Sequence, residues 1–256
     1  MSEIKITVLG SGTSQGVPVI ACDCSVCQSL DPKDNRLRSS IMVSYDNKNY
    51  VIDSGPDFRQ QMLREKVQTL EAVVFTHEHK DHVAGLDDVR AFNFKENKDM
   101  KVYCSDLVEI ALKREFHYVF RAFTYPGIPK IDLNIIDKSP FLLGAKTWTP
   151  IEVFHHKLSV LGFRIGDFTY ITDAKTISDE EKDKARNSKV LIINALRHEE
   201  HISHFNLDEA LAMIEELQPE KAYLTHISHY LGKNEELKSK LPKNVELAYD
   251  GLVFTV

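Results

Sequence analysis

The stretch Thr76-His77-Glu78-His79-Lys80-Asp81-His82 decides how this chain folds and what chemistry it carries. It follows Ala72-Val73-Val74-Phe75, an apolar run typical of a buried strand. His77 and His79, two residues apart in extended backbone, project to one side and can bind one metal ion, while Asp81 and His82 can reach a second. Imidazole and carboxylate suit zinc, manganese or iron. Four potential ligands directly after a buried strand argue against a merely polar surface loop.

Strand and helix patterns alternate around this stretch. Periodicity predicts strands at 4–8, 40–45, 49–52, 72–75, 101–104, 151–154, 161–165, 168–171 and 190–193, with a hairpin turn around 46–48. It predicts helices at 56–66, 106–116 and 207–217. The segment 123–140, with three prolines, is typical of a loop. No repeat or linker interrupts the pattern, so we expect one domain over residues 1–256, with two mixed sheets packed together and helices outside.

Composition and charge restrict the function classes. The chain is 43% apolar and 27% charged, which is ordinary for a folded globular protein. A net charge of −6 disfavours nucleic acid as a partner without excluding it. No apolar run is long enough to span a bilayer, and the chain opens into a strand pattern rather than a signal peptide. We therefore expect a cytoplasmic protein with no membrane partner, and the sequence leaves a homodimer open.

Three of the four cysteines form a second constellation. Cys22, Cys24 and Cys27 fall within six residues, whereas Cys104 lies far away at the end of an apolar strand and is assigned no role. In a reducing compartment such a cluster indicates a metal site rather than disulfides. Structural zinc almost always takes four ligands, and His229 is the candidate to complete the set. The sequence thus predicts a zinc-binding loop at about residues 20–30, against the alternative of three free thiols.

The motif from His77 to His82 resembles the H-x-H-x-D-H hallmark of the metallo-β-lactamase superfamily. The resemblance implies an αββα sandwich and extends to Asp53, His155, Asp173 and His226. It implies two divalent metal ions, zinc or manganese, in the active site. The ligands that it implies are His77, His79 and His155 for one metal, Asp81, His82 and His226 for the other, and Asp173 as a bridge.

Some of these positions can also be interpreted from their local sequence, independently of the resemblance. Asp173 follows the strand pattern at 168–171, where a carboxylate at a strand end can reach two metals or simply cap a turn. His155 and His156 are adjacent and face opposite ways, so only one is a ligand, and we choose His155. For Asp53 we expect a carboxylate that orients a metal-binding imidazole.

Further motifs resemble a narrower group, the PhnP-type phosphodiesterases related to tRNase Z. These are the Gly10-Ser11-Gly12-Thr13-Ser14 loop, the C-x-C-x-x-C cluster, the segment 52–59 and Thr225-His226-Ile227-Ser228-His229. The resemblance implies a structural zinc beside the two-metal centre. It also implies hydrolysis of a small or cyclic phosphodiester, the expected partner of this chain, by attack of a metal-bound hydroxide.

The resemblance also implies catalytic roles. Asp81 and Asp173 take part as metal ligands, and His204, just before the helix at 207–217, assists the leaving group. His198 and His201 are interpreted as solvated loop residues.

Other readings compete with the phosphodiesterase. The same fold serves tRNA 3′-processing nucleases and thioester or lactone hydrolases, but this sequence lacks the long basic arm that a tRNA enzyme would use. A non-hydrolytic metal-binding protein is the least favoured, because the chain leaves no room for an added cofactor domain. A purely structural zinc protein does not account for the ligands outside the cysteine cluster.

Overall fold

The computed structural model describes residues 3–121 and 125–256 and contains two mixed β-sheets. The first has the order β15 (Val253–Thr255), β1 (Lys5–Gly10), β2 (Ser40–Tyr45), β3 (Lys48–Ile52), β4 (Ala72–Val74), β5 (Met100–Cys104), β6 (Ile131–Ile135). The second has the order β11 (Thr176–Ile177), β8 (Lys146–His155), β9 (Leu158–Ile165), β10 (Phe168–Tyr170), β12 (Val190–Asn194), β13 (Lys221–Thr225), β14 (Val245–Leu247), and β7 (Phe141–Leu143) pairs with β8.

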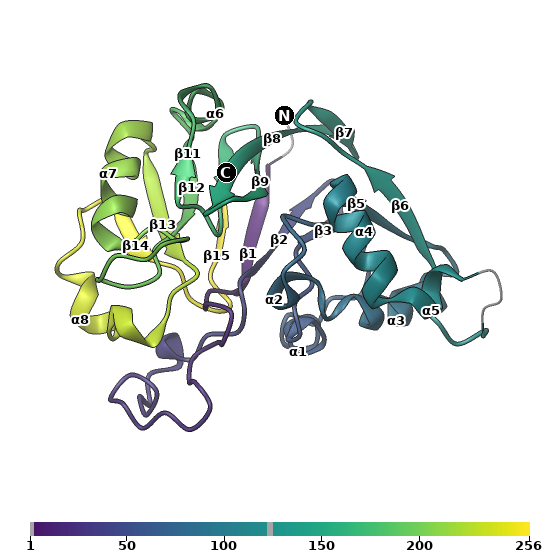
Figure 1. The fold of residues 1–256 in the computed structure, drawn as a ribbon, viewed down its shortest axis with the longest axis horizontal. Helices are drawn as coiled ribbons and strands as arrows, with labels where there is room; N and C mark the ends of the chain where they lie inside the picture. Colours follow the sequence, from purple (N-terminus) through teal and green to yellow (C-terminus); the bar gives the residue numbers. More distant parts are fainter. Residues whose placement is uncertain (1–2, 122–124) are drawn as a thin grey trace.

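Helices cover the outer faces of both sheets (Figure 1). On the side of the first sheet lie α1 (Phe58–Arg64), α2 (Lys80–Val83), α3 (Arg90–Glu96), α4 (Asp106–Glu115) and α5 (His117–Phe120). On the side of the second lie α6 (Asp179–Ala185), α7 (Leu207–Leu217) and α8 (Asn234–Lys238). The predicted αββα sandwich is confirmed. No helix in the described part of the chain combines the length and apolarity that crossing a bilayer requires.

Buried apolar side chains form three layers of core, as this stacking requires. Trp148, Tyr50 and Phe163 belong to the layer between the sheets. A second layer lies between β8–β14 and the helices α6 and α7, and a third lies between the first sheet and α1 to α4. Each sheet thus buries both faces, which explains why strands such as β4 and β12 are continuous apolar runs.

Local sequence signals set several of these elements. Asp46 and Asn47 both take positive φ, 50° and 58°, which gives the β2–β3 hairpin the turn that matches strand twist. A capping box begins α7, because the Asn206 side chain accepts from the Glu209 N–H while the Glu209 carboxylate accepts from the Asn206 N–H. These two elements begin and end within a residue of the predicted positions.

One prediction about a segment was wrong. Residues 123–140 were expected to be a loop, but Ile131–Ile135 forms β6, the edge strand beside β5. Its side chains are half-buried or exposed, so the apolar alternation that marks a strand is weak. The prolines lie outside the strand, at 126, 129 and 140, and residues 123 and 124 lie outside the described part.

The topology gathers strand ends at one edge of the sandwich. β3, β4, β5 and β6 run parallel, as do β10, β12, β13 and β14. β8 runs in the same direction as β10, since both pair antiparallel with β9. Loops after these strands therefore meet at a shared edge, the usual place for ligands in sheets of this kind.

Candidate metal centre

Three residues of the predicted centre directly follow or closely follow strands in a left-handed backbone conformation. Asp53 comes after β3 with φ 66°, Asp173 after β10 with φ 56°, and His226 after β13 with φ 55°. Such backbone is strained for residues other than glycine and tends to occur at functional sites. The strand ends thus turn these side chains out of the ladder and into the space between the sheets' loops.

Four of the predicted ligands form one compact group. Asp81, His82, Asp173 and His226 each offer a ligand atom, and these atoms all lie within 4.8 Å of one another. Asp173 is central: one of its oxygens lies 3.3 Å from His82 Nε2, and the other lies 3.2 Å from His226 Nε2. The group is the set predicted for the second metal together with the predicted bridge.

Asp53 lies behind this group rather than in it. Its carboxylate is fully buried, lies 2.7 Å from His82 Nδ1 and accepts hydrogen bonds from the backbone and the hydroxyl of Thr76. This contact leaves His82 Nε2 directed at Asp81 and Asp173. An imidazole held in this way has a fixed ring orientation, as expected from the sequence.

His77, His79 and His155 gather beside the first group. The His77 ring lies 4.7 Å from that of His79 and 4.2 Å from that of His82, and the His79 ring lies 5.2 Å from that of His155. His156 takes a φ of 58° and is exposed. The geometry therefore favours His155 over its neighbour.

His204 lies closer to the centre than a remote proton donor would. Its ring is 4.4 Å from that of His155 and 4.7 Å from that of His226. Together with His155 and Asp173 it offers ligand atoms within 4.8 Å of one another. The structure thus places His204 where it could either bind a metal or contact a substrate.

The two other histidines of this run differ from each other. His198 is exposed, as expected, with Nε2 2.9 Å from the Leu231 carbonyl oxygen. His201 was also expected to be solvated, but it is half-buried, with its ring 5.1 Å from that of His204. Its Nδ1 accepts a hydrogen bond from the backbone N–H of Ser203. The loop before α7 folds back on the centre, which no local pattern indicated.

Burial and charge act together on this centre. Burial, with His82 alongside, lowers the pKa of His77 well below its ordinary value. Burial alone would lower the pKa of His82, but Asp173 and Asp53 outweigh it and raise that pKa. Burial and the nearby His226 lower the pKa of His204 to about 2. A cation bound among these groups would take the place of the proton on His82, as metal binding generally does.

The nitrogen atoms that converge here lack hydrogen-bond partners in the described part of the protein and are suited to bind a metal ion. Among the described residues, buried imidazole nitrogens without a hydrogen-bond partner include His77 Nε2, His82 Nε2, His155 Nδ1, His204 Nδ1 and His226 Nε2. Buried polar atoms nearly always have partners, so this concentration calls for an explanation. Neutral imidazoles and carboxylates converging on one region are the donor set of zinc or manganese sites.

Two threonines that support the centre were missed in the sequence. The Thr76 hydroxyl donates to Asp53 and lies 3.0 Å from His77 Nδ1. The Thr172 hydroxyl donates to Asp173 Oδ2 at 2.7 Å. Each precedes a predicted ligand directly, at the end of a buried strand. That position is the signal that could have identified them.

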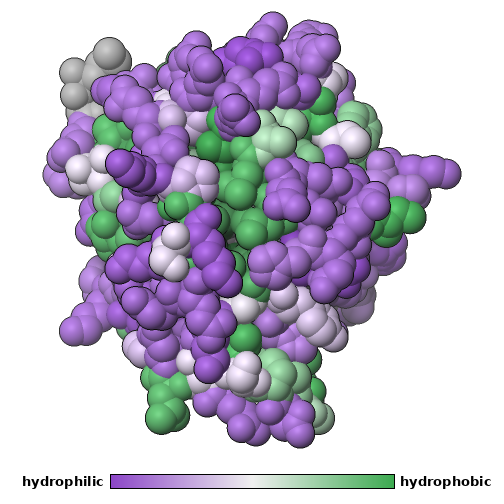
Figure 2. Space-filling model, turned by 90° about the vertical axis from the view of Figure 1, so that its left-hand side faces the viewer, coloured by the Kyte–Doolittle hydropathy of each residue, from purple (hydrophilic) through white to green (hydrophobic). Residues whose placement is uncertain are grey.

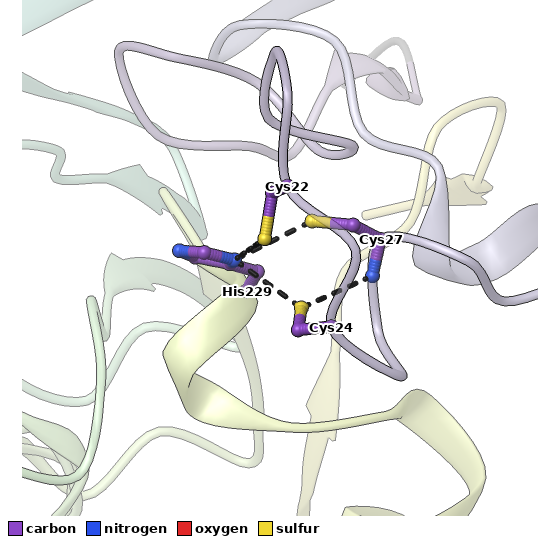
Figure 3. A group of neighbouring side chains, drawn as sticks. All are labelled: Cys22, Cys24, Cys27 and His229. Atoms are coloured by element: carbon purple, nitrogen blue, oxygen red, sulfur yellow. Dashed lines mark hydrogen bonds between the residues drawn. The ribbon is translucent and has the colours of Figure 1, made fainter.

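The cysteine cluster assembles as predicted. His229 Nδ1 lies 3.3 Å from Cys22 Sγ and 3.4 Å from both Cys24 Sγ and Cys27 Sγ, and Figure 3 shows the three sulfurs around this nitrogen. The backbone N–H of Cys27 lowers the pKa of Cys24 to about 6, whereas burial raises the pKa of Cys27 to about 11. These three sulfurs and one imidazole nitrogen all lie within 4.8 Å of one another, and three cysteines with one histidine are a donor set of the structural zinc type.

One short segment joins the cysteine cluster to the centre. His226 and His229 are three residues apart, and Ile227 between them donates its N–H to the Ser11 carbonyl and accepts from the Thr13 N–H. The Ser11–Thr13 backbone leads into the cysteine loop, which extends away from the sandwich at the bottom of Figure 1. The N-terminal loop thus holds the segment that carries a predicted ligand of each site.

A cavity of about 650 Å³ lies far from this chemistry. It is lined by α7 and β14 residues such as Leu211, Ile214 and Val245, with Pro219 and Pro242. Figure 2 shows an apolar hollow on this otherwise mostly hydrophilic face. Pro219 and Val245 lie at the starts of β13 and β14, the edge opposite His226. The cavity therefore does not serve the candidate centre.

Comparison with known proteins identifies the family. The family model described as "Beta-lactamase superfamily domain" matches residues 48–227, most of the chain, including Asp53 and His226. The chain belongs to the beta-lactamase superfamily. Its fold is that of a hydrolase of this superfamily, and its His/Asp clusters offer ligand atoms for metal ions.

Individual relatives narrow the comparison. The structure is similar to the crystal structure of a new diphosphatase from the PhnP family, with a TM-score of 0.94 and 39% identity over 100% of this chain and 98% of the other. It has the fold of the human short-form tRNase Z, with a TM-score of 0.70 and 16% identity over 98% of each chain.

A curated relative is much longer than this chain. An octanoyltransferase of Porphyromonas gingivalis is 38% identical over 252 residues, which are 97% of this chain and 51% of the relative. The superfamily member thus spans about half the length of that protein.

Proposed function

We propose that this superfamily member is a phosphodiesterase that hydrolyses a small or cyclic phosphodiester. The observation that carries the proposal is Asp173, whose two oxygens face different imidazoles and which belongs to both His/Asp groups. Two divalent cations bound there would lower the pKa of a water molecule and neutralise charge on the phosphate oxygens. The likeness to the PhnP-family diphosphatase over the full chain supports reaction at phosphorus.

In this proposal His77, His79 and His155 would hold one cation, Asp81, His82 and His226 would hold the other, and Asp173 would serve both. Cys22, Cys24, Cys27 and His229 would hold a structural zinc. The protein would then bind three metal ions, zinc or manganese in the centre and zinc in the cysteine cluster.

The remaining residues position the ligand side chains and the leaving group. Asp53 fixes the ring of His82, and Thr172 fixes the carboxylate of Asp173. His204, buried beside His155 and Asp173, donates its ring N–H to the oxygen of the leaving group, where negative charge develops. The carboxylates of Asp81 and Asp173 would offset the positive charge of the two cations.

Hydrolysis of a thioester is the second candidate, favoured by one observation. The Porphyromonas relative is named octanoyltransferase, which supports an octanoyl thioester as a substrate to test. A phosphodiester remains the first candidate because the diphosphatase matches over its whole length.

The test is an assay of the zinc- or manganese-supplemented protein on a panel of substrates. The panel contains bis(p-nitrophenyl) phosphate, a 2′,3′-cyclic nucleotide, a 1,2-cyclic ribose phosphate, a precursor tRNA and an octanoyl thioester. We expect turnover of at least one small phosphodiester, abolished in Asp173→Ala. Turnover of the thioester or the tRNA with no turnover of any small phosphodiester would overturn the proposal.

A further inference from the structure

A groove lies at the edge of the sandwich where the metal centre is built. Its volume is about 410 Å³, within the usual range for small-molecule sites. The first turn of α4, the end of β6 and the β8–β9 hairpin enclose it. None of its lining residues belongs to the candidate centre.

Two connections place the groove next to the centre. Leu161, which lines the groove, donates its N–H to the carbonyl of Thr76, the residue before His77. Glu152, which also lines it, lies three residues before His155 on β8. At about 3.3 Å per residue along a strand, the groove wall is on the order of 10 Å from the centre. A substrate that contacts both would have to extend over about this distance.

The floor of the groove is apolar and partly open. Ile136 and Leu161 are buried beneath it, whereas Leu107 and Ile135 are 49% and 50% exposed. Exposed aliphatic side chains facing an enclosed space gain free energy when a ligand removes them from water. The floor therefore favours an apolar group, and the groove has room for one of the size of an aromatic ring.

The rim carries more negative than positive charge. Lys138 contacts the Glu152 carboxylate at 2.5 Å, so these two charges offset each other. Asp106 and Asp137 also lie at the rim, and each accepts a local backbone N–H, from Leu107 and Ser139 respectively. A ligand group with a negative charge would be repelled here, while a neutral or cationic group would not.

We propose that this groove binds the organic substituent of the substrate, and that this substituent is an apolar, ring-sized group without negative charge. The inference rests on the proposed function, because it assumes that a phosphoryl group occupies the metal centre. Leu107 and Ile135 are then specificity-determining residues. The acidic rim selects against substituents that carry a carboxylate or a further phosphate.

Binding to the metal-loaded protein tests this, with inorganic phosphate, phenyl phosphate and 4-carboxyphenyl phosphate as probes in isothermal titration calorimetry. We expect phenyl phosphate to bind roughly 10-fold more tightly than phosphate, and the carboxylated probe to lose most of that gain. Leu107→Ser should remove about 3- to 10-fold of the gain and leave phosphate affinity unchanged. Ile110→Ser is the matched control, since Ile110 is an exposed aliphatic of α4 outside the groove.

Adding a positive charge to the groove supplies a gain of affinity that loss of folding cannot imitate. Ile135→Lys should make 4-carboxyphenyl phosphate the tighter of the two aryl probes. Equal affinity of the wild type for phosphate and phenyl phosphate would overturn the inference while leaving the proposed function standing. Equal losses in Leu107→Ser and Ile110→Ser would also overturn it. Binding of neither phosphate nor phenyl phosphate, with no phosphodiester turnover, would overturn both.

Discussion

At the scale of single residues, the position of His204 fits two different roles. Its ring contacts those of His155 and His226, and its Nδ1 lies 3.8 Å from Asp173 Oδ1. A proton or hydrogen-bond donor to the leaving group and a metal ligand are both compatible with that place. The two roles differ in what a substitution removes.

Replacing His204 by alanine should keep the metals and lower turnover by about 100-fold to 10,000-fold, the usual scale for a side chain positioned on the leaving group in the transition state. The loss should be smaller for a p-nitrophenyl ester than for an ester with an alkoxide leaving group, because p-nitrophenolate scarcely needs a proton. Metal analysis and kinetics on both esters measure this. Loss of metal, or equal losses on both esters, would instead make His204 a ligand or a scaffold residue.

Asp173→Ala provides the contrast on the same measurements. Its carboxylate is 2% exposed and faces His82 and His226, so its removal should cost metal and activity together. His156→Ala is the control, because His156 is exposed at the tip of the β8–β9 hairpin. It should retain both metal and turnover.

At the scale of elements, the centre depends on close packing between two loops. A Cβ built at Gly55 would lie 2.0 Å from the carbonyl oxygen of Asp81, so the loop after β3 and the segment with His82 contact through bare backbone. No side chain can be inserted there without moving one of the two segments.

Gly55→Ala should therefore displace Asp81 and lower metal content by at least half, with a fall in melting temperature. Gly166→Ala is the matched control: Gly166 has a φ of 58°, and its added Cβ would meet nothing nearer than 3.8 Å. It should lower stability by about 1 kcal/mol through backbone strain alone and keep its metals. Full metal content in Gly55→Ala would show that the loop position does not depend on this contact.

At the scale of the whole molecule, the cysteine loop and the sandwich meet through the segment from His226 to His229. Thiolate-bound zinc contributes to folding, whereas the metals of an open hydrolase centre exchange more readily. The purified protein should hold roughly three metal ions per chain, and mild chelation should leave at least one. A single ion after zinc and manganese supplementation would contradict the two-site description.

Cys24→Ser should lower the melting temperature by roughly 5 to 10 °C and affect chemistry less than stability. Ser25→Ala, an exposed neighbour in the same loop, is the control and should melt like the wild type. Calorimetry with zinc analysis measures both. Unchanged melting and unchanged zinc content in Cys24→Ser would remove support for the cysteine site.

Two expectations about the whole chain stay predictions: that residues 1–256 form one domain, and that the protein is located in the cytoplasm.

The sequence by itself determined what depends on neighbouring residues. The run from His77 to His82 carries four candidate ligands within six residues. The β2–β3 hairpin and α7 follow from turn and capping residues within a few positions. The sequence did not predict strand β6, because none of its side chains is fully buried. A strand with one buried face would show the alternation of apolar and polar residues from which strands are predicted.

Only the tertiary structure decided which distant residues meet. Sequence spacing did not indicate that His201 lies against His204. It named His155 and His229 as candidates, but it could not show that His155 turns inward, or that His229 meets Cys22, Cys24 and Cys27 some two hundred positions away. The physical reason is that these contacts follow from sheet order and from which strand ends share an edge. Those features are fixed by packing two sheets and their helices together, and a local pattern of residues contains no record of them.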